Sequence, residues 1–315
     1  MAHPMFAPLL AVMAVAPSSA GEIRPAMPRE STTGPATIDL WVRRPGTTGS
    51  AEPASTRDRA RQISLDELAL RDVQRVDVQY HGAFTYRGVE LAALIDGFAP
   101  PPSADLALLH FANGMQIPLA FRDTELVHQL APFVARGMRL GPNRPMQIGR
   151  FPKVSRSSAV RDPRPIVFYG NKLVVADAGH PDVPPAHRTV LSPWALADSL
   201  IGIEFVSRAA YYEQFDVDQD PQVKEGERLY AQSCQFCHGV RQTGAAFGWD
   251  FVDPTPIAEY RHGRNFFLHV HYKPQDAVAR GLRMPALSYM SEDEAQSLWR
   301  WLKAIADHPL RPYRP

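Results

Sequence analysis

The residues with the clearest chemistry are two cysteines and a histidine in the last third of the chain. Cys234 and Cys237 are separated by two residues, His238 follows at once, and the chain of 315 residues holds just these two cysteines. The pattern C-x-x-C-H is the one through which a haem is attached covalently, with the histidine as proximal ligand of the iron. We therefore predict one haem c, bonded through Cys234 and Cys237 and ligated by His238.

Three other interpretations of the cysteine pair compete with a haem site. A thioredoxin-like redox pair would stand at the start of a helix after a strand, whereas the segment before Cys234 has a polar, helical pattern. A zinc site would need two further ligands, and the spacing of the available histidines fits no familiar arrangement. A disulfide across two residues would be strained. The candidate zinc ligands are His262, His269 and His271.

A methionine further along the chain is the candidate for the distal iron ligand. Met284 stands 46 residues after His238 and is followed by Pro285 and then by a helical pattern. A thioether is a good axial ligand and raises the reduction potential of the iron relative to histidine or thiolate. We therefore expect Met284 as the distal ligand. Met290 is the first alternative and the three histidines named above are the next, while core packing is the usual role of an isolated methionine.

Two helices are expected to frame this site. Asp220-Pro221 is typical of a helix start, and Ser-Glu-Asp-Glu at residues 291–294 has the form of a capping box. Gly226 has no side chain, so a second helix can cross the first one closely there, with Trp301 as its contact. The apolar residues at helical spacing are Val223, Leu229 and Tyr230 in the first helix and Ala295, Leu298, Trp301, Leu302 and Ile305 in the second.

With these features, residues 217–308 resemble a mono-haem class I cytochrome c domain. The segments that carry the resemblance are residues 226–230, the Cys234-Cys237-His238 motif, Met284-Pro285 and residues 298–302. The resemblance implies a small all-α fold and single-electron transfer. In that family a proline carbonyl usually hydrogen-bonds to the free nitrogen of the proximal histidine, and Pro254 and Pro256 are both candidates.

The N-terminus has the pattern of an export signal. Residues 6–16 form a largely apolar run and Ser18-Ser19-Ala20 is a small-residue cleavage site, although no lysine or arginine precedes the run. The run is too short to span a bilayer, and no cysteine stands near Ala20 to carry a lipid. We predict a signal peptide at residues 1–20. Because covalent haem attachment takes place outside the bacterial cytoplasm, we also predict a periplasmic location.

Length and composition favour more than one domain. The apolar fraction of 45% suffices for sizeable cores, and a net charge of +1 argues against strong attraction to nucleic acid. Residues 21–60 are rich in Pro, Ser, Thr and Arg and are expected to be irregular, with a possible first strand at 37–42. Residues 61–216 have the pattern of a mixed α/β domain, and residues 309–315 form a C-terminal tail.

Within residues 61–216 short strands and helices alternate, as judged from apolar periodicity. Helical segments are expected at 63–68 and 91–98, and strands at 73–80, 84–89, 106–111, 115–120, 165–175 and 200–206.

This order resembles the oxidoreductase molybdopterin-binding domain of the sulfite oxidase family. The segments that carry the resemblance are residues 63–68, 86–95, 110–114 with the strand after them, Trp194, and residues 201–205. Catalytic members of that family bind molybdenum through a cysteine thiolate shortly after the strand placed here at 73–80. This chain has Gln79-Tyr80-His81-Gly82 there and no cysteine, and His81 is the remaining candidate ligand. We therefore expect a non-catalytic domain without a molybdenum cofactor, since fold does not fix function.

A basic stretch follows in the same domain. Between Arg136 and Arg164 the chain has eight basic residues and one acid, Asp162. This stretch is either an anion pocket or docking face for an acidic redox partner, or a long solvated loop.

These features predict a periplasmic c-type cytochrome that transfers single electrons and whose N-terminal domain docks a partner or binds a small anion. The expected partners are redox proteins of the periplasm, with no nucleic acid and no stable membrane insertion. One alternative is an enzyme whose N-terminal domain oxidises a substrate, in the manner of a sulfite dehydrogenase, and passes electrons to the haem. A second alternative is a haem-based redox or gas sensor.

Overall fold

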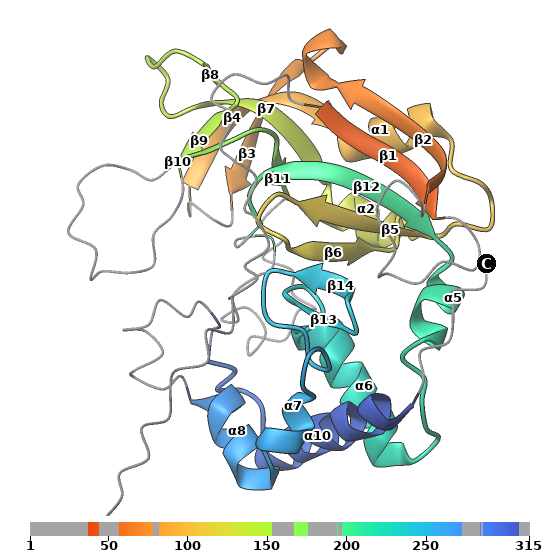
Figure 1. Ribbon diagram of the computed structural model, residues 1–315. Coiled ribbons are helices and arrows are strands. Elements are labelled where there is room, and N and C mark those ends of the chain that lie inside the picture. Colours follow the sequence, from red (N-terminus) through yellow and green to blue (C-terminus); the bar gives the residue numbers. More distant parts are fainter. Residues whose placement is uncertain are drawn as a thin grey trace, which may run out of the picture.

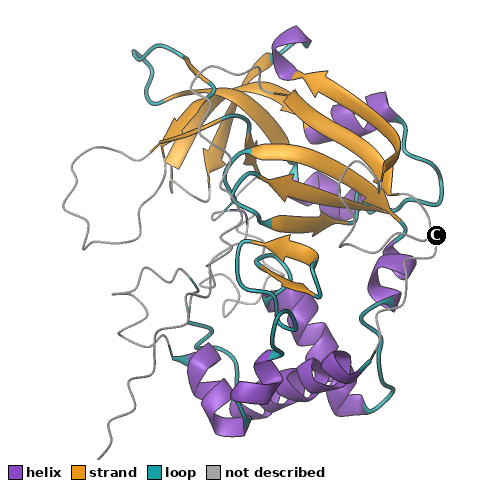
Figure 2. Cartoon of the chain, in the orientation of Figure 1, coloured by secondary structure: helices purple, strands orange, loops and turns teal. Residues whose placement is uncertain are grey.

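The computed structural model describes residues 37–43, 57–77, 82–152, 167–175, 194, 197–272, 284 and 286–308. These residues form a sheet-rich N-terminal part and a mainly helical C-terminal part (Figure 1). The short helix α5 (Arg208–Glu213) lies between the two parts. The colouring by secondary structure shows the same division: most strands, with a few short helices, lie in the upper part, and most helices, with one β-hairpin, lie in the lower part (Figure 2). The protein is thus a multi-domain chain of mixed α/β character.

The first sheet of the N-terminal part has five strands in the order β2-β1-β12-β5-β6. Strand β1 pairs with β12 in parallel, and the other neighbours are antiparallel. The strands are β1 (Thr37–Arg43), β2 (Arg57–Ser64), β5 (Leu106–Phe111), β6 (Gln116–Leu119) and β12 (Leu200–Val206).

Strand β5, near the middle of the first sheet, is buried on both faces. Successive side chains of a strand point to opposite faces, so its residues enter two different cores. In β5, Ala107 and Leu109 join a core that also contains the apolar residues of helix α1 (Leu91–Phe98). Leu106 and Leu108 of the same strand, with Val206 of β12, belong instead to the core of the C-terminal part. The sheet therefore lies between α1 on one face and the C-terminal part on the other.

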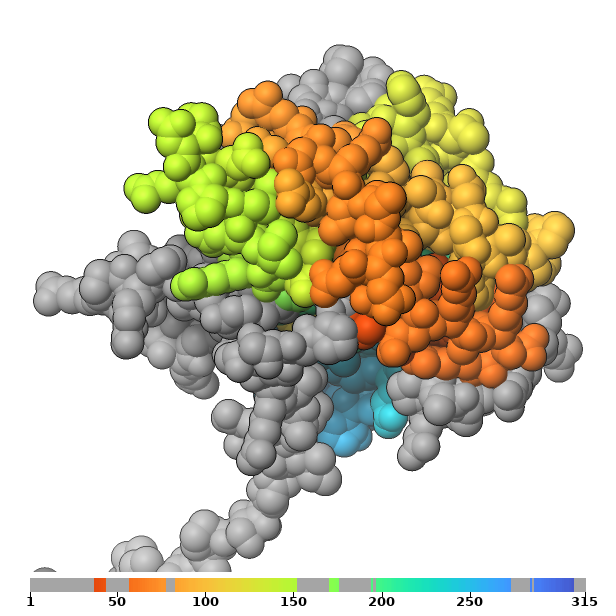
Figure 3. Space-filling model, turned by 90° about the horizontal axis from the view of Figure 1, so that it is seen from above, coloured from red at the N-terminus to blue at the C-terminus, as the bar shows by residue number. Residues whose placement is uncertain are grey.

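A second sheet completes the N-terminal part, with strands in the order β11-β7-β4-β3 and β8 paired with β7. Its strands are β3 (Arg71–Asp77), β4 (Gly82–Glu90), β7 (Phe133–Arg139), β8 (Gln147–Ile148) and β11 (Lys172–Val174), and a separate pair is formed by β9 (Arg150–Pro152) and β10 (Val167–Tyr169). In the view from above, these strands and α1 lie in front of the C-terminal part, of which a small blue area is visible (Figure 3).

The C-terminal part contains four described helices and one β-hairpin. Its elements are α6 (Pro221–Ser233), β13 (His238–Val240), β14 (Thr243–Ala246), α7 (Ile257–Tyr260), α8 (Gly263–His271) and α10 (Glu292–Asp307). The hairpin corrects the expectation of an all-α domain: Arg241 and Gln242 both adopt positive φ, the conformation of a two-residue turn that suits the twist of paired strands. Among the described residues, none of the helices combines the length and apolar character that crossing a membrane requires.

Helices α6 and α10 are capped as their sequences predicted. The Asp220 carboxylate accepts hydrogen bonds from the backbone N–H groups of Gln222 and Val223. At the start of α10, Ser291 and Glu294 form the reciprocal capping box. Both caps satisfy amide groups that a helix start leaves unpaired.

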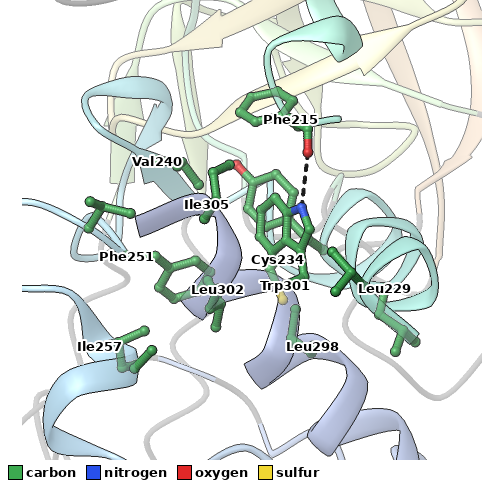
Figure 4. Packing of buried hydrophobic residues seen from close by; sticks show 14 of the residues in the cluster. Phe215, Leu229, Cys234, Val240, Phe251, Ile257, Leu298, Trp301, Leu302 and Ile305 are labelled. Carbon is green, nitrogen blue, oxygen red and sulfur yellow. Dashed lines mark hydrogen bonds between the residues drawn. The ribbon is translucent and has the colours of Figure 1, made fainter. Parts of the chain in front are cut away.

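The two helices cross at Gly226. A Cβ atom added there would lie 2.2 Å from the carbonyl oxygen of Ser297 and 2.6 Å from Cβ of Trp301. The Trp301 ring stacks on that of Tyr230, with centroids 4.6 Å apart, and its Nε1 donates a hydrogen bond of 3.0 Å to the Phe215 carbonyl (Figure 4). The predicted contact between Gly226 and Trp301 is confirmed.

Most of the expected elements of the N-terminal part lie where the sequence placed them. The segments at 37–42, 91–98, 106–111 and 200–206 are β1, α1, β5 and β12. The strands expected at 84–89 and 115–120 are β4 and β6, and the expected 73–80 is β3 as far as Asp77, with residues 78–80 outside the described residues. The expected strand at 165–175 is two strands, β10 and β11, interrupted at Gly170.

Several segments differ from expectation, and the short elements β8, β9 and α5 were not predicted. Strand β2 continues to Ser64, so the helix expected at 63–68 is reduced to a three-residue 3-10 turn at Leu65–Glu67. This strand was not recognised because it is a polar edge strand, whose charges protect the sheet from pairing with other chains. Helix α2 (Thr124–Leu130) and strand β7 were also not predicted. The first residues of the basic stretch, Arg136 and Arg139, therefore lie in a strand rather than in a solvated loop.

We predict that Gly226→Ala lowers the stability of the full chain by about 1–3 kcal/mol, because the new methyl group must force the helices apart. In an unconstrained helix, the same change would stabilise by about 1 kcal/mol. Gly97→Ala in α1 is the matched control, since a Cβ there has no atom within 4 Å. Denaturant unfolding of the three proteins measures the difference. Equal or greater stability of Gly226→Ala would contradict the close crossing.

Candidate haem-attachment site

The C-x-x-C-H motif begins where helix α6 ends. Cys234 is the C-cap residue of α6, and its carbonyl accepts hydrogen bonds from the backbone N–H groups of Cys237, at 3.1 Å, and His238, at 2.9 Å. The tight turn therefore brings both thiols and the imidazole to the same end of the helix. Cys234 is buried in the C-terminal core, in the same cluster as Trp301 (Figure 4). Cys237 is half-buried.

The environment of the two thiols does not suit nucleophilic redox chemistry. Both cysteines are free, and burial raises the pKa of Cys234 to about 12 and that of Cys237 to about 11. A reactive cysteine needs the opposite, a pKa lowered by a helix N-terminus or a nearby cation. The thioredoxin-like interpretation is therefore disfavoured. The zinc interpretation also lacks support, because the described residues contain no group of three or more His, Cys, Asp or Glu side chains that could hold a metal ion.

His238 is held as a neutral imidazole with one ring nitrogen anchored. Its Nδ1 lies 2.7 Å from the carbonyl oxygen of Trp249, which can only accept, so Nδ1 carries the proton. Burial lowers the pKa of His238, and its ring stacks on Phe251 with centroids 4.4 Å apart. The lone pair of Nε2 is thereby left for a metal, in the arrangement usual for ligating histidines.

The hydrogen-bond partner of the His238 ring differs from the expected one. The sequence offered the carbonyls of Pro254 and Pro256, but the structure assigns the bond to Trp249. The loop after β14 turns back toward the motif, and the Gly248 amide donates to the Cys237 carbonyl at 2.6 Å. A Cβ on Gly248 would lie 2.4–2.9 Å from three atoms of the His238 ring. The glycine is thus what allows the backbone to approach the imidazole.

Asp250, which was not predicted as a site residue, holds this loop in place through hydrogen bonds to its backbone. Its carboxylate accepts four backbone N–H bonds, from Arg241 at 2.9 Å, Gln242 at 2.6 Å, Val252 at 2.8 Å and Asp253 at 2.9 Å. It therefore ties the turn of the β13–β14 hairpin to the loop that carries the Trp249 carbonyl. The sequence signal for this role is an aspartate in a loop, directly after Gly248 and Trp249. Aspartate side chains in loops often accept hydrogen bonds from nearby backbone N–H groups.

The three histidines considered as ligands lie on or beside α8. His262 is the N-cap residue of α8, and His271 donates from Nδ1 to the Met290 carbonyl at 2.8 Å. The pKa of His269 is lowered by burial and by the nearby positive charge of Arg261.

The two candidate methionines differ in their surroundings. Met290 is 1% exposed and lies in the C-terminal core, and its carbonyl is bound by His271. Met284 is half-buried and packs against the same core. Pro285 and residues 273–283 lie outside the described residues. Met290 thus has the packing role usual for methionine, and Met284 stays the predicted distal ligand.

The residues present fit a covalently bound haem. Two thiols stand at the required spacing, and a neutral imidazole with an anchored Nδ1 follows them. Trp249 is 81% exposed although its carbonyl contacts His238. An exposed apolar side chain beside such a site is a surface that a large apolar cofactor can contact.

The ligand proposed for molybdenum lies outside what the structure describes. His81 and its neighbours Gln79 and Tyr80 are not among the described residues. The family-typical cysteine is missing from the sequence itself, since both cysteines belong to the C-x-x-C-H motif.

We predict that Asp250→Ala destabilises the protein by about 3 kcal/mol, because four amides lose a charged acceptor. Asp250→Asn is the control: it keeps one acceptor oxygen and should lose less than half as much. Denaturant midpoints of the haem-loaded proteins measure the effect. An Ala variant as stable as the wild type would show that the carboxylate does not organise the loop.

Comparison with known proteins supports the assignment of the C-terminal part. Residues 221–302 match the family model described as cytochrome C oxidase, cbb3-type, subunit III. A search of curated proteins finds no significant match to the chain. The matched range runs from the first residue of α6 into α10 and includes both cysteines and His238. The C-terminal part is therefore a cytochrome c domain, whose cofactor is a haem c and whose function is haem-based electron transfer.

Proposed function

We propose that the protein is a periplasmic c-type cytochrome that carries one haem c and exchanges single electrons with redox proteins. The observation that carries this proposal is His238 beside the two thiols, neutral and anchored at Nδ1 by the Trp249 carbonyl. The proposed periplasmic location is supported by the export pattern at residues 1–20 and by the compartment in which haem is attached covalently.

In this proposal each residue of the site has a defined task. The haem iron supplies the one-electron couple between the ferric and ferrous states. Cys234 and Cys237 would hold the porphyrin through thioether bonds, so that the cofactor could not dissociate. His238, oriented by Trp249, would be the proximal ligand, and Met284 would be the distal ligand, whose thioether would favour the reduced state. Asp250 keeps the loop of Trp249 in place.

The N-terminal part is proposed to be non-catalytic and to dock a redox partner. The sequence has no cysteine in this part to bind molybdenum as in the sulfite oxidase family. The first arginine of the basic stretch is not available to bind an anion. Arg136 is buried and makes a bidentate pair with Asp66, at 2.7 and 3.0 Å. Its charge is therefore already compensated. The substrate-oxidising enzyme is the second candidate, and the redox or gas sensor is the third.

We predict that Met284→Ala changes the absorption spectrum of the reduced haem and lowers its midpoint potential, because the iron loses its thioether ligand. Met290→Ala is the control. It should cost about 2–5 kcal/mol of stability by leaving a core cavity but should keep the spectrum. A spectrum unchanged in Met284→Ala would support an open or labile sixth site, as the sensor requires.

Metal analysis separates the carrier from the enzyme. Protein made in a host that exports it, attaches haem and makes molybdenum cofactor should contain one iron and no molybdenum per chain. One iron with one molybdenum would contradict the non-catalytic proposal, and His81→Ala should then remove the molybdenum. Absence of iron would contradict the cytochrome itself.

A further inference from the structure

The β5–β6 turn and the first residue of β6, in the N-terminal part, make main-chain hydrogen bonds to the C-x-x-C-H motif and to β14. The Gln116 N–H donates to the carbonyl of Phe236, inside the C-x-x-C-H motif, at 3.2 Å. The Ala246 N–H, in β14, donates to the carbonyl of Gly114 at 2.7 Å. Strands β6 and β14 accordingly lie next to each other across the boundary between the two parts (Figure 1).

The absence of a side chain at Gly114 allows the backbone of the β5–β6 turn to contact the backbone of β14. Its φ is +87°, and an added Cβ would lie 2.9–3.0 Å from the carbonyl carbon and oxygen of Ala246 and from the Phe247 nitrogen. Real Cβ atoms rarely come so close to backbone, so any other residue would separate the turn from β14. The contact between the turn and β14 therefore requires glycine at position 114.

Apolar packing joins the same surfaces. Phe236, Cys237 and Phe247 pack against the core of the first sheet, which belongs to the N-terminal part. In the other direction, Leu106 and Leu108 of β5 belong to the core of the C-terminal part. Cys237, one of the two attachment thiols, thus lies at the boundary between the two parts, whereas Cys234 lies inside the C-terminal core.

Buried polar groups fix this boundary further. On the face of the first sheet that looks toward the C-terminal part, Glu204 pairs with Arg43 and with His110, the latter at 2.9 Å. Burial alone would raise the pKa of Glu204, but Arg43 and His110 lower it to about 2, so the carboxylate is charged. The Arg43 guanidinium lies 5.8 Å from the centre of the Tyr211 ring.

The tyrosines of α5 connect this charged cluster to both sides of the contact. The Tyr211 hydroxyl donates to Oε1 of Gln116 at 3.2 Å, and the Tyr212 hydroxyl donates to Oε1 of Gln235 at 3.3 Å. Gln116 is in the N-terminal part and Gln235 is inside the C-x-x-C-H motif. A buried network with each member bonded holds its members in one geometry.

We propose that the β5–β6 turn with Gly114, together with Gln116 at the start of β6, forms a permanent wall of the haem site that shields the Cys237 side of the cofactor from water. This inference rests on the proposed function, because it requires haem at Cys234 and Cys237. Excluding water disfavours the more highly charged ferric state, so the wall raises the reduction potential. With this side covered by the chain itself, redox partners exchange electrons with the haem at another side.

The test uses the full-length, haem-loaded protein and the variant Gly114→Ala. Gly149→Ala is the matched control: Gly149 also has a positive φ, of +61°, but an added Cβ there meets the buried guanidinium of Arg136 in the second sheet, away from the β5–β6 turn. Hydrogen exchange of the Ala246 amide reports on the contact, and a redox titration reports on the potential.

In Gly114→Ala we expect the Ala246 amide to exchange at least about tenfold faster than in the wild type, and the midpoint potential to fall. In Gly149→Ala both should stay at the wild-type values. The same exchange rate or the same potential in the two variants would overturn the proposal. If no haem is bound even by the wild type, the proposed function fails instead, and the two failures are thus distinguishable.

If Gly114→Ala does not fold, Tyr211→Phe is the second variant that tests the proposal. The change removes one hydroxyl and its bond to Gln116 and leaves the aromatic packing with Phe215 in place. We expect a fall in potential in the same direction but smaller. A Tyr211→Phe protein with wild-type potential and wild-type Ala246 exchange would overturn the proposal.

Discussion

The close crossing of α6 and α10 at Gly226 is the constraint on which the cytochrome c domain depends. The absence of a side chain at this position lets Trp301 reach Tyr230 and Phe215. With this contact the end of α6 is fixed, and with it the turn that carries both thiols and His238. The hairpin, the Asp250 loop and the Trp249 carbonyl then complete a frame that holds one imidazole in one tautomer.

The contacts that hold the attachment segment in place also include residues of the N-terminal part. One face of the first sheet contributes Leu106, Leu108 and Val206 to the domain's core, and the charged group around Glu204 lies on that face. A buried ion pair is costly to desolvate, and removing one partner leaves an uncompensated buried charge, so Arg43 and Glu204 depend on each other. The two parts of the chain therefore act as one body around the attachment segment, which is why we assign the N-terminal part a role in the properties of the haem.

Local signals could be predicted from the sequence, whereas contacts between distant loops could not. The motif, the caps at Asp220 and Ser291, and the pair of Gly226 with Trp301 follow from spacing within one or two helices. The anchor of His238 was assigned to the wrong residues because a carbonyl acceptor has no side-chain signature. The contact between Gly114 and β14 could not be predicted from the sequence for a similar reason, since it joins main-chain atoms more than 100 residues apart.

Covalent attachment of one haem is the central claim, and the intact mass of the exported protein under denaturing conditions tests it most directly. We predict a chain heavier than the polypeptide by one haem, with the increase located by peptide mapping on the fragment that holds Cys234 and Cys237. The mass of the polypeptide alone, or of a polypeptide oxidised to a disulfide between these cysteines, would contradict the account.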